Sequence, residues 1–188
     1  MNKELKNLIT CDIYRHFENK RPLMYRWRTP NLNYMILFRK ANYHHTHNHR
    51  VRAFIYKFQM RRLSNRFHIQ IPINSHIGKG FYIGHYGRVI INGSATIGNN
   101  CNVGTGVTIG YSARGKYQGV PTIGNNVWIG TNAVIVGNVS IGDDVLIAPN
   151  SYVNRDIPSH SIVVGNPMQI KPMEQATKDY IIRVKEDA

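Results

Sequence analysis

Residues 123–153 read IGNNVWIGTNAVIVGNVSIGDDVLIAPNSYV, and this stretch repeats with a period of six. Ile or Val occupies every sixth position in it without interruption. The same spacing occurs upstream in two shorter runs. The three runs together contain thirteen such positions: Ile71, Ile77, Ile83, Ile91, Ile97, Val103, Ile109, Ile123, Ile129, Ile135, Ile141, Ile147 and Val153.

A period of six matches neither the helical period of about 3.6 residues nor the simple alternation of a strand. It fits a coil of three short strands, in which Gly or Asn turns each strand into the next because these residues tolerate unusual backbone angles. The aliphatic side chains then fill the interior, and stacked coils pair as parallel strands about 4.8 Å apart. The sequence therefore predicts a mainly β fold, a β-helix of roughly five coils. A β-sandwich with fortuitous Ile spacing is the alternative architecture.

The period is broken at two places. Two extra residues lie between Ile83 and Ile91, in the sequence IGHYGRVI, and two lie between Ile109 and Ile123 beyond a multiple of six. The second break contains YSARGKYQGVP, which is rich in Gly and charge. Because of this composition, we interpret it as a loop that projects from the β-helix. Loops on rigid scaffolds commonly carry function.

The net charge of +14 is spread unevenly along the chain. Residues 1–68 hold 15 Lys and Arg against 3 Asp and Glu, whereas residues 69–188 hold 9 against 7. Apolar spacing within the basic segment predicts helices over about 3–17, 32–43 and 51–63, the last with a stripe formed by Val51, Phe54, Ile55, Phe58 and Leu63. This segment is interpreted as a helical subdomain packed on the β-helix with a solvated basic face. The alternatives are a surface that docks on anionic lipid or a lipid-linked glycan, and a nucleic-acid surface, for which no motif is present.

The remaining features of the sequence bear on membrane insertion, cellular location, disulfide bonds and metal binding. No stretch reaches the roughly 18 apolar residues of a membrane span, and the N-terminus lacks the apolar core of a secretory signal, so a cytoplasmic location is expected. The two cysteines, Cys11 and Cys101, do not suggest a disulfide framework, and Cys101 falls at a core position. The tract His44–His49 (HHTHNH) has a metal-binding composition, but no Cys or carboxylate joins it, which favours a solvated helix end or turn.

Residues 69–172 resemble the hexapeptide-repeat acyltransferases. This resemblance, and not the spacing, implies a left-handed β-helix. The family commonly ends in a D-I-P, G-x-P and basic pattern, which is similar to NRDIPSHSIVVGNPMQIKP here. The expected organisation is a basic helical segment (1–68), a left-handed β-helix acyltransferase domain (69–172) and a short helix over 173–188 that caps the open last coil.

His85 is the candidate catalytic residue. It occupies an outward position in the first break of the period, and the surrounding IGHYGRVIIN resembles the serine acetyltransferases and related polysaccharide O-acetyltransferases, in which the catalytic His has this setting. Acyl transfer from a thioester needs a base for the acceptor hydroxyl and donors for the developing oxyanion. The resemblance implies that His85 is that general base and that acetyl-CoA is the acyl donor. His76 and His160, also in the repeats, lack this context.

The resemblance to serine acetyltransferase proper is incomplete at three positions. Where that family has D-I-H-P, this chain has Gln70-Ile71-Pro72-Ile73. Gly84 replaces the family's Asp before the catalytic His, and Val120 replaces a later His. These polar residues are tied to amino-acid handling, so we expect a sugar acceptor, in capsule or exopolysaccharide synthesis. Serine O-acetylation in cysteine biosynthesis is the alternative.

The resemblance also implies a homotrimer that binds acetyl-CoA in a groove between adjacent β-helices. The candidate cofactor-binding residues are Gly110, Arg114, Lys116, Thr131, Ala148, Pro149 and Lys171. No metal is expected. A zinc hydratase on the same fold needs three converging histidines, and His76 and His85 are only nine residues apart. A non-catalytic scaffold is the remaining alternative.

Overall fold

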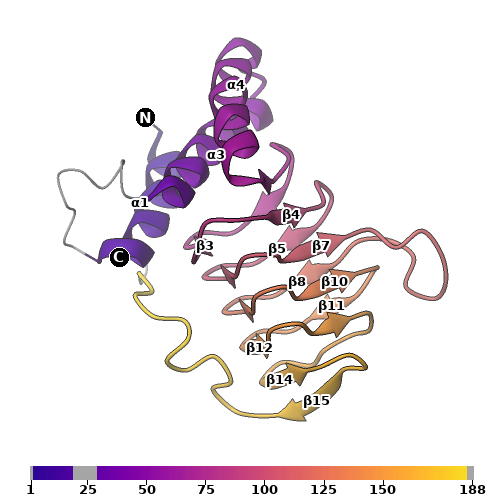
Figure 1. Cartoon of the computed structure of the whole chain (residues 1–188). Helices are drawn as coiled ribbons and strands as arrows, with labels where there is room; N and C mark the ends of the chain where they lie inside the picture. Colours follow the sequence, from indigo (N-terminus) through magenta and orange to yellow (C-terminus); the bar gives the residue numbers. More distant parts are fainter. Residues whose placement is uncertain (1, 19–28, 186–188) are drawn as a thin grey trace.

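The computed structural model describes residues 2–18 and 29–185. It is a left-handed parallel β-helix of about five coils with three helices at its N-terminal end, as Figure 1 shows. The predicted fold class is confirmed. No helix of the described residues is long and apolar enough to cross a membrane.

The β-helix has three sheets, one for each side of a triangular prism. Neighbouring strands are parallel, except that β14 and β15 are antiparallel and close the last coil. The first sheet contains β1 (Ile69–Gln70), β4 (Val89–Ile91), β7 (Thr108–Gly110), β10 (Val134–Val136) and β13 (Tyr152–Val153). The second contains β2 (His76–Ile77), β5 (Thr96–Ile97), β8 (Thr122–Ile123) and β11 (Ser140–Ile141). The third contains β3 (Tyr82–Ile83), β6 (Asn102–Val103), β9 (Trp128–Ile129), β12 (Val145–Ile147), β14 (Ser161–Val164) and β15 (Gln169–Pro172).

The six-residue period forms the interior of the prism. Each aliphatic residue pairs with its equivalent one coil away, as in Ile97 with Ile123, and twelve of the thirteen predicted positions are buried. Ile77, in the first coil, is half-buried. Cys101 also points inward, and burial raises the pKa of its thiol to about 12. Several corners use Asn in the left-handed region, including Asn126 and Asn132, because its short polar side chain tolerates this conformation.

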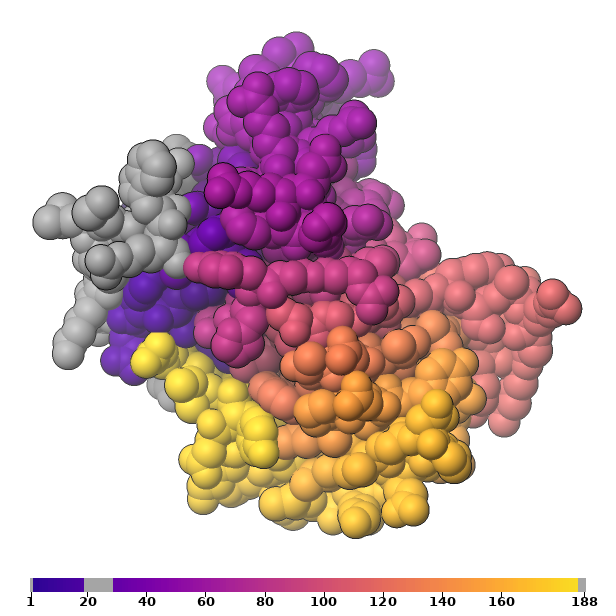
Figure 2. All heavy atoms as spheres, in the orientation of Figure 1, coloured from indigo at the N-terminus to yellow at the C-terminus, as the bar shows by residue number. Residues whose placement is uncertain are grey.

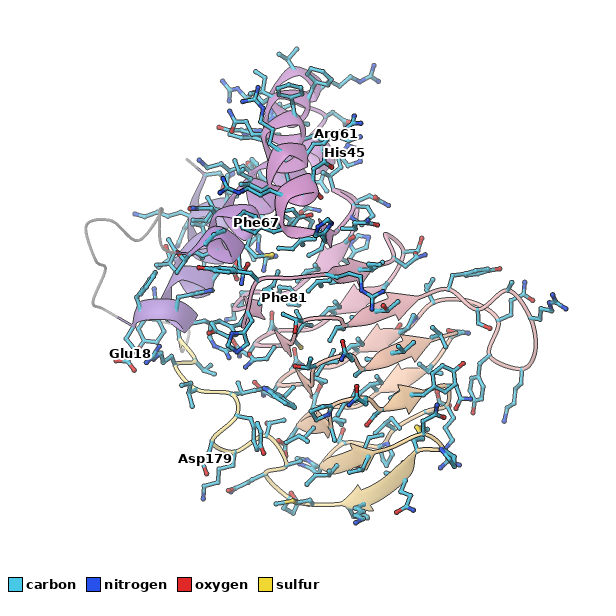
Figure 3. The ribbon with its side chains drawn as sticks, viewed as in Figure 1. Glu18, His45, Arg61, Phe67, Phe81 and Asp179 are labelled. Atoms are coloured by element: carbon cyan, nitrogen blue, oxygen red, sulfur yellow. The ribbon has the colours of Figure 1, made fainter. Side chains whose placement is uncertain are left out.

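The three predicted N-terminal helices are present as α1 (Lys3–Phe17), α3 (Pro30–Thr46) and α4 (Arg50–Phe67). Helix α1 begins at Asn2, whose side chain accepts a hydrogen bond from the Glu4 N–H, and α3 begins at a proline. Apolar side chains of α3 and α4, including Tyr34 and Met60, join the same core as the first coils. Phe81 is fully buried at this junction (Figure 3).

The helices satisfy the backbone groups that the first coil leaves unpaired. A terminal coil exposes carbonyl groups with no neighbouring strand, and buried carbonyls need partners. Arg39 donates to the carbonyls of Ile77 and Gly78, while Asn42 donates to those of Ile73 and Ser75. The division into separate domains stays a prediction, since this segment completes the edge of the β-helix.

The apolar stripe of helix α4 does not pack on the β-helix as the sequence predicted. Val51, Phe54, Ile55 and Phe58 are exposed, and the buried residues of this helix are Ala53 and Met60. The helix extends beyond the end of the prism and packs against α3 (Figures 1 and 3).

Two further segments leave the prism. Residues 111–120 form the predicted projecting loop, closed by an antiparallel bridge between Ser112 and Gly119 (Figure 2). The predicted C-terminal helix over 173–188 is wrong for the described residues, which form turns from 174 to 180 and run along the third sheet. Gln175, Asp179 and Arg183 have positive φ angles, which an α-helix cannot accommodate. Residues 186–188 lie outside the described residues.

Candidate functional site

His85 lies on one edge of the prism, where the strands of the third sheet turn into those of the first. Ile83, Val103, Ile129 and Ile147 are in register, so the corners that follow them stack along this edge. The second residue of each corner forms a column: His85, Thr105, Thr131 and Pro149. We call this column, with the residue before each member, the His85 edge.

The corner that carries His85 is wider than the one stacked on it. Seven residues separate the core positions Ile83 and Ile91, whereas five separate Val103 and Ile109, with which they pair. The extra residues bulge outward, with Gly87 at φ +138°, and they leave His85 exposed. The predicted period break is therefore the reason that this side chain projects from an otherwise regular edge.

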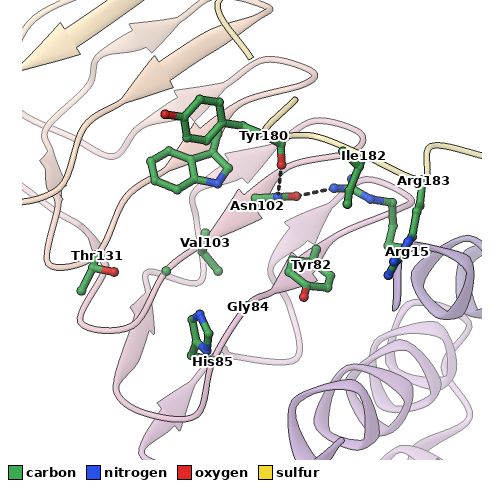
Figure 4. A pocket seen from close by; sticks show the side chains of 12 residues that line it. Arg15, Tyr82, Gly84, His85, Asn102, Val103, Thr131, Tyr180, Ile182 and Arg183 are labelled. Atoms are coloured by element: carbon green, nitrogen blue, oxygen red, sulfur yellow. Dashed lines mark hydrogen bonds between the residues drawn. The ribbon is translucent and has the colours of Figure 1, made fainter. Parts of the chain in front are cut away.

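A cavity of about 310 Å³ opens beside His85 (Figure 4). Four parts of the chain, distant in sequence, form its walls: the last turn of α1, the outer face of the third sheet, the His85 edge and the C-terminal tail. We call it the Arg15–His85 pocket. Its lining consists of Arg15, Tyr82, Gly84, His85, Asn102, Val103, Gly104, Trp128, Thr131, Tyr180, Ile182 and Arg183.

Outward side chains of the third sheet hold the α1 and tail walls together. Asn102 accepts a hydrogen bond from Arg15 at 2.5 Å and donates one to the Tyr180 carbonyl at 3.1 Å (Figure 4). Trp128 packs edge-on against the Tyr180 ring, with 4.9 Å between the ring centroids. The pocket wall therefore depends on the tail lying along the sheet.

Asp144 anchors the tail near its start. Its carboxylate accepts hydrogen bonds from the N–H groups of Ala176 and Thr177, from the Thr177 hydroxyl and from His160. Burial alone would raise the pKa of Asp144, but the hydrogen bonds, led by those from Thr177, outweigh it and lower this pKa. The hydrogen bond to Asp144 in turn raises the pKa of His160.

The His85 ring has no hydrogen-bond partner among the described residues of this single chain. Gly84 offers no side chain, and Gln70 lies on β1 in the first sheet, outside the pocket. A neutral imidazole can take the proton of a hydroxyl as that hydroxyl attacks. The chemistry open to His85 is therefore proton transfer at the mouth of the pocket.

The predicted cofactor-binding residues fall into two groups and one separate residue, Lys171. Thr131, Ala148 and Pro149 lie on the His85 edge, and Thr131 lines the pocket. Gly110 ends β7, and Arg114 and Lys116 are exposed in the projecting loop, which leaves the edge between the first and second sheets. Lys171 lies on β15, paired with Ile162. One copy of the chain therefore does not bring the loop group to His85.

The three histidines of the repeats do not converge. His76 lies on β2 of the second sheet, and His160 lies next to Asp144 just before β14. Within the described ranges, no three His, Cys, Asp or Glu side chains are placed to hold a metal ion. In the His44–His49 tract, His44 and His49 contact each other at 3.1 Å between their Nδ1 atoms.

Sequence reasoning missed most of the pocket. Tyr82, Asn102 and Trp128 each precede an inward aliphatic residue by one position, so their outward row was readable from the repeat. Arg15 and Arg183 come from opposite ends of the chain, and only the fold brings them together.

Residues 121–155 match the family model described as bacterial transferase hexapeptide (six repeats). Over these residues the β-helix is therefore similar to the hexapeptide-repeat transferases. Among curated relatives, the chain is 38% identical over 128 residues to serine acetyltransferase 2 of Arabidopsis thaliana, an alignment that covers 68% of this chain and 39% of the relative.

Two solved structures share the fold over nearly the whole chain. The serine acetyltransferase of Neisseria gonorrhoeae in complex with serine has a TM-score of 0.72 at 26% identity, covering 90% of this chain and 70% of that one. The enzyme of Brucella abortus in complex with coenzyme A has a TM-score of 0.75 at 24% identity, covering 92% and 70%. The chain spans about two fifths of the length of the first curated relatives it matches. The polysaccharide enzymes expected from the sequence receive no support from these relatives.

Proposed function

We propose that this protein is an O-acetyltransferase that moves the acetyl group of acetyl-CoA to a hydroxyl of a small acceptor, with His85 as general base. The observation that carries the proposal is the exposed His85 in the widened corner, beside a pocket, on a hexapeptide-repeat fold. The similarity to serine acetyltransferases supports both the donor and the type of reaction.

The reaction proceeds by direct transfer between two bound substrates. His85 takes the proton as the acceptor oxygen attacks the thioester carbonyl carbon. The tetrahedral intermediate then collapses, the C–S bond breaks, and the proton returns from His85 to the departing thiolate. Neither cysteine serves as an acyl carrier, because Cys11 and Cys101 are both buried.

A homotrimer completes the acetyl-CoA site in this proposal. Thr131, Ala148 and Pro149 of one copy form one wall, beside His85. Gly110 and the loop cations Arg114 and Lys116 of a neighbouring copy form the other, because the loop leaves a different edge of the prism. Lys171 remains a candidate for a phosphate of the donor.

The names of the relatives make serine the first acceptor to test. A sugar hydroxyl is the second candidate, since Gln70, Gly84 and Val120 replace three polar residues that the serine enzymes use for their amino acid. A scaffold without catalysis, with the basic helices as its binding surface, is the alternative of another class.

The decisive experiment follows CoA release with serine, neutral sugars and acidic sugars as acceptors. We expect turnover with at least one acceptor and a loss of about 10²–10⁴-fold in turnover for His85→Ala, with donor binding retained. His76→Ala is the matched control, since His76 is also exposed but lies on the second sheet. Near-normal turnover of His85→Ala would show that His85 is not the general base. If no acceptor gave CoA release, the transferase would be rejected in favour of the non-catalytic scaffold.

A further inference from the structure

The Arg15–His85 pocket has an excess of positive charge. Two arginines line it, Arg15 and Arg183, and none of its described lining residues is Asp or Glu. Arg15 is only 3% exposed, so its charge is held in the wall and not in bulk solvent. A buried cation is costly unless an anion or a full set of hydrogen bonds compensates it.

The carboxylates near Arg15 form ion pairs with other arginines. Asp12, fully buried, accepts from Arg39 at 2.8 and 3.1 Å and from the Phe81 N–H at 3.0 Å. Glu18 forms an ion pair with Arg183 at 3.2 Å. Asp12 and Glu18 therefore each pair with another arginine, and Arg15 forms an ion pair with neither.

Arg15 has only neutral hydrogen-bond partners. It donates to the Gly80 carbonyl at 3.1 Å and to the Asn102 side chain at 2.5 Å, and its buried Nε has no partner. Burial lowers the pKa of this guanidinium to about 10, which still leaves it charged at neutral pH. A cation in this state lacks the anion that would stabilise it.

We propose that the acceptor carries an anionic oxygen group, a carboxylate or a phosphate, which binds on the Arg15 side of the pocket and directs a hydroxyl toward His85. The inference rests on the proposed acetyl transfer and names its substrate class. An acceptor ammonium, as in serine, finds no carboxylate among the described lining residues. A hydroxy acid or an acidic sugar fits this charge pattern better than an amino acid.

The remaining walls suit a small ring or a short hydroxy acid. The Trp128 and Tyr180 rings provide an apolar surface next to the polar Asn102, and few polar groups among apolar walls are typical of small-molecule sites. The cavity of about 310 Å³ lies at the small end of the range for such sites.

Matched acceptor pairs test the inference on the full-length protein. Glucuronate against glucose adds a carboxylate, glucose 6-phosphate against glucose adds a phosphate, and glycerate against serine replaces the ammonium by a hydroxyl. Both CoA release and binding by calorimetry are measured. We expect each anionic sugar to exceed glucose, and glycerate to exceed serine, by at least about tenfold in kcat/KM, since a charge-assisted hydrogen bond is worth roughly that much.

Variants of the pocket test whether Arg15 causes the preference for anionic acceptors. Arg15→Gln is expected to reduce the ratio of kcat/KM for the anionic acceptor to that for glucose about tenfold, with Arg15→Lys recovering part of the preference. Lys57→Gln, an exposed charge on α4, is the matched control. If Arg15→Gln fails to fold, the partly exposed Arg183→Gln and the salt dependence of the wild-type preference serve instead.

The outcomes separate this inference from the proposed function. Acetylation of neutral and anionic acceptors with equal kcat/KM would overturn the anionic class and leave the transferase intact. A preference for serine over glycerate would overturn the expectation that an acceptor ammonium is disfavoured. Selective binding of anionic compounds without any CoA release would support the pocket and reject the transferase.

Discussion

Neutralising Asp12 should destabilise the protein far more than any surface charge does. Asp12 in α1 and Arg39 in α3 are 0% and 2% exposed, and their two hydrogen bonds connect these helices. Asp12 also accepts from the Phe81 N–H, and Arg39 donates to carbonyls of the first coil. In Asp12→Asn, the buried Arg39 loses its counter-ion while its surroundings stay unchanged.

The expected loss in the free energy of unfolding is about 3–5 kcal/mol, because removing one partner of a buried pair leaves an uncompensated charge. This is a large fraction of the 5–15 kcal/mol or so that stabilises a typical domain. Glu18→Gln, which breaks the exposed pair with Arg183, should cost about 0–1 kcal/mol.

Urea unfolding, followed by far-UV circular dichroism at one protein concentration, measures both variants against the wild type. The double variant Asp12→Asn/Arg39→Met should recover part of the loss, since it removes the uncompensated charge as well. A cost for Asp12→Asn below about 1 kcal/mol, equal to that of Glu18→Gln, would refute the reasoning that this pair connects the helices to the β-helix.

Three further results are expected. The tail should stay anchored best between about pH 4 and 6.5. The pKa of Asp144 is lowered in the folded protein, so the stability that Asp144 contributes is lost as the pH falls through this lowered pKa. The pKa of His160 is raised, so the stability that His160 contributes is lost as the pH rises through this raised pKa. In a Trp27→Phe variant, a red shift of the Trp128 fluorescence reports release of the tail from the third sheet. An unchanged emission spectrum from pH 3 to 8 would contradict the predicted pH dependence. Gly130→Ala should cost about 1–3 kcal/mol, because its Cβ would lie 2.6 Å from the Pro149 nitrogen, whereas Gly110→Ala, with 3.4 Å to its nearest atom, should leave the thermal midpoint nearly unchanged. Sedimentation should show a trimer, and a stable, fully active monomer would exclude the shared acetyl-CoA site.

The sequence alone determined the β-helix, because an interior column needs the same kind of side chain once per strand. The row from Ile71 to Val153 expresses that requirement directly, and twelve of its thirteen members are buried. The period breaks likewise marked the projecting loop and the widened corner of His85. These are local signals, which a repeat makes visible.

Only the tertiary structure decided what surrounds His85. The predicted C-terminal helix is replaced by turns, because hydrogen bonds from Asp144, a residue about thirty positions upstream, hold the chain at Ala176 and Thr177. The pocket forms where the tail meets α1 and the third sheet, and so it joins Arg15 to Arg183. Their charges become informative only when burial and neighbours are known, because the cost of a cation depends on which carboxylates the fold has already paired with others.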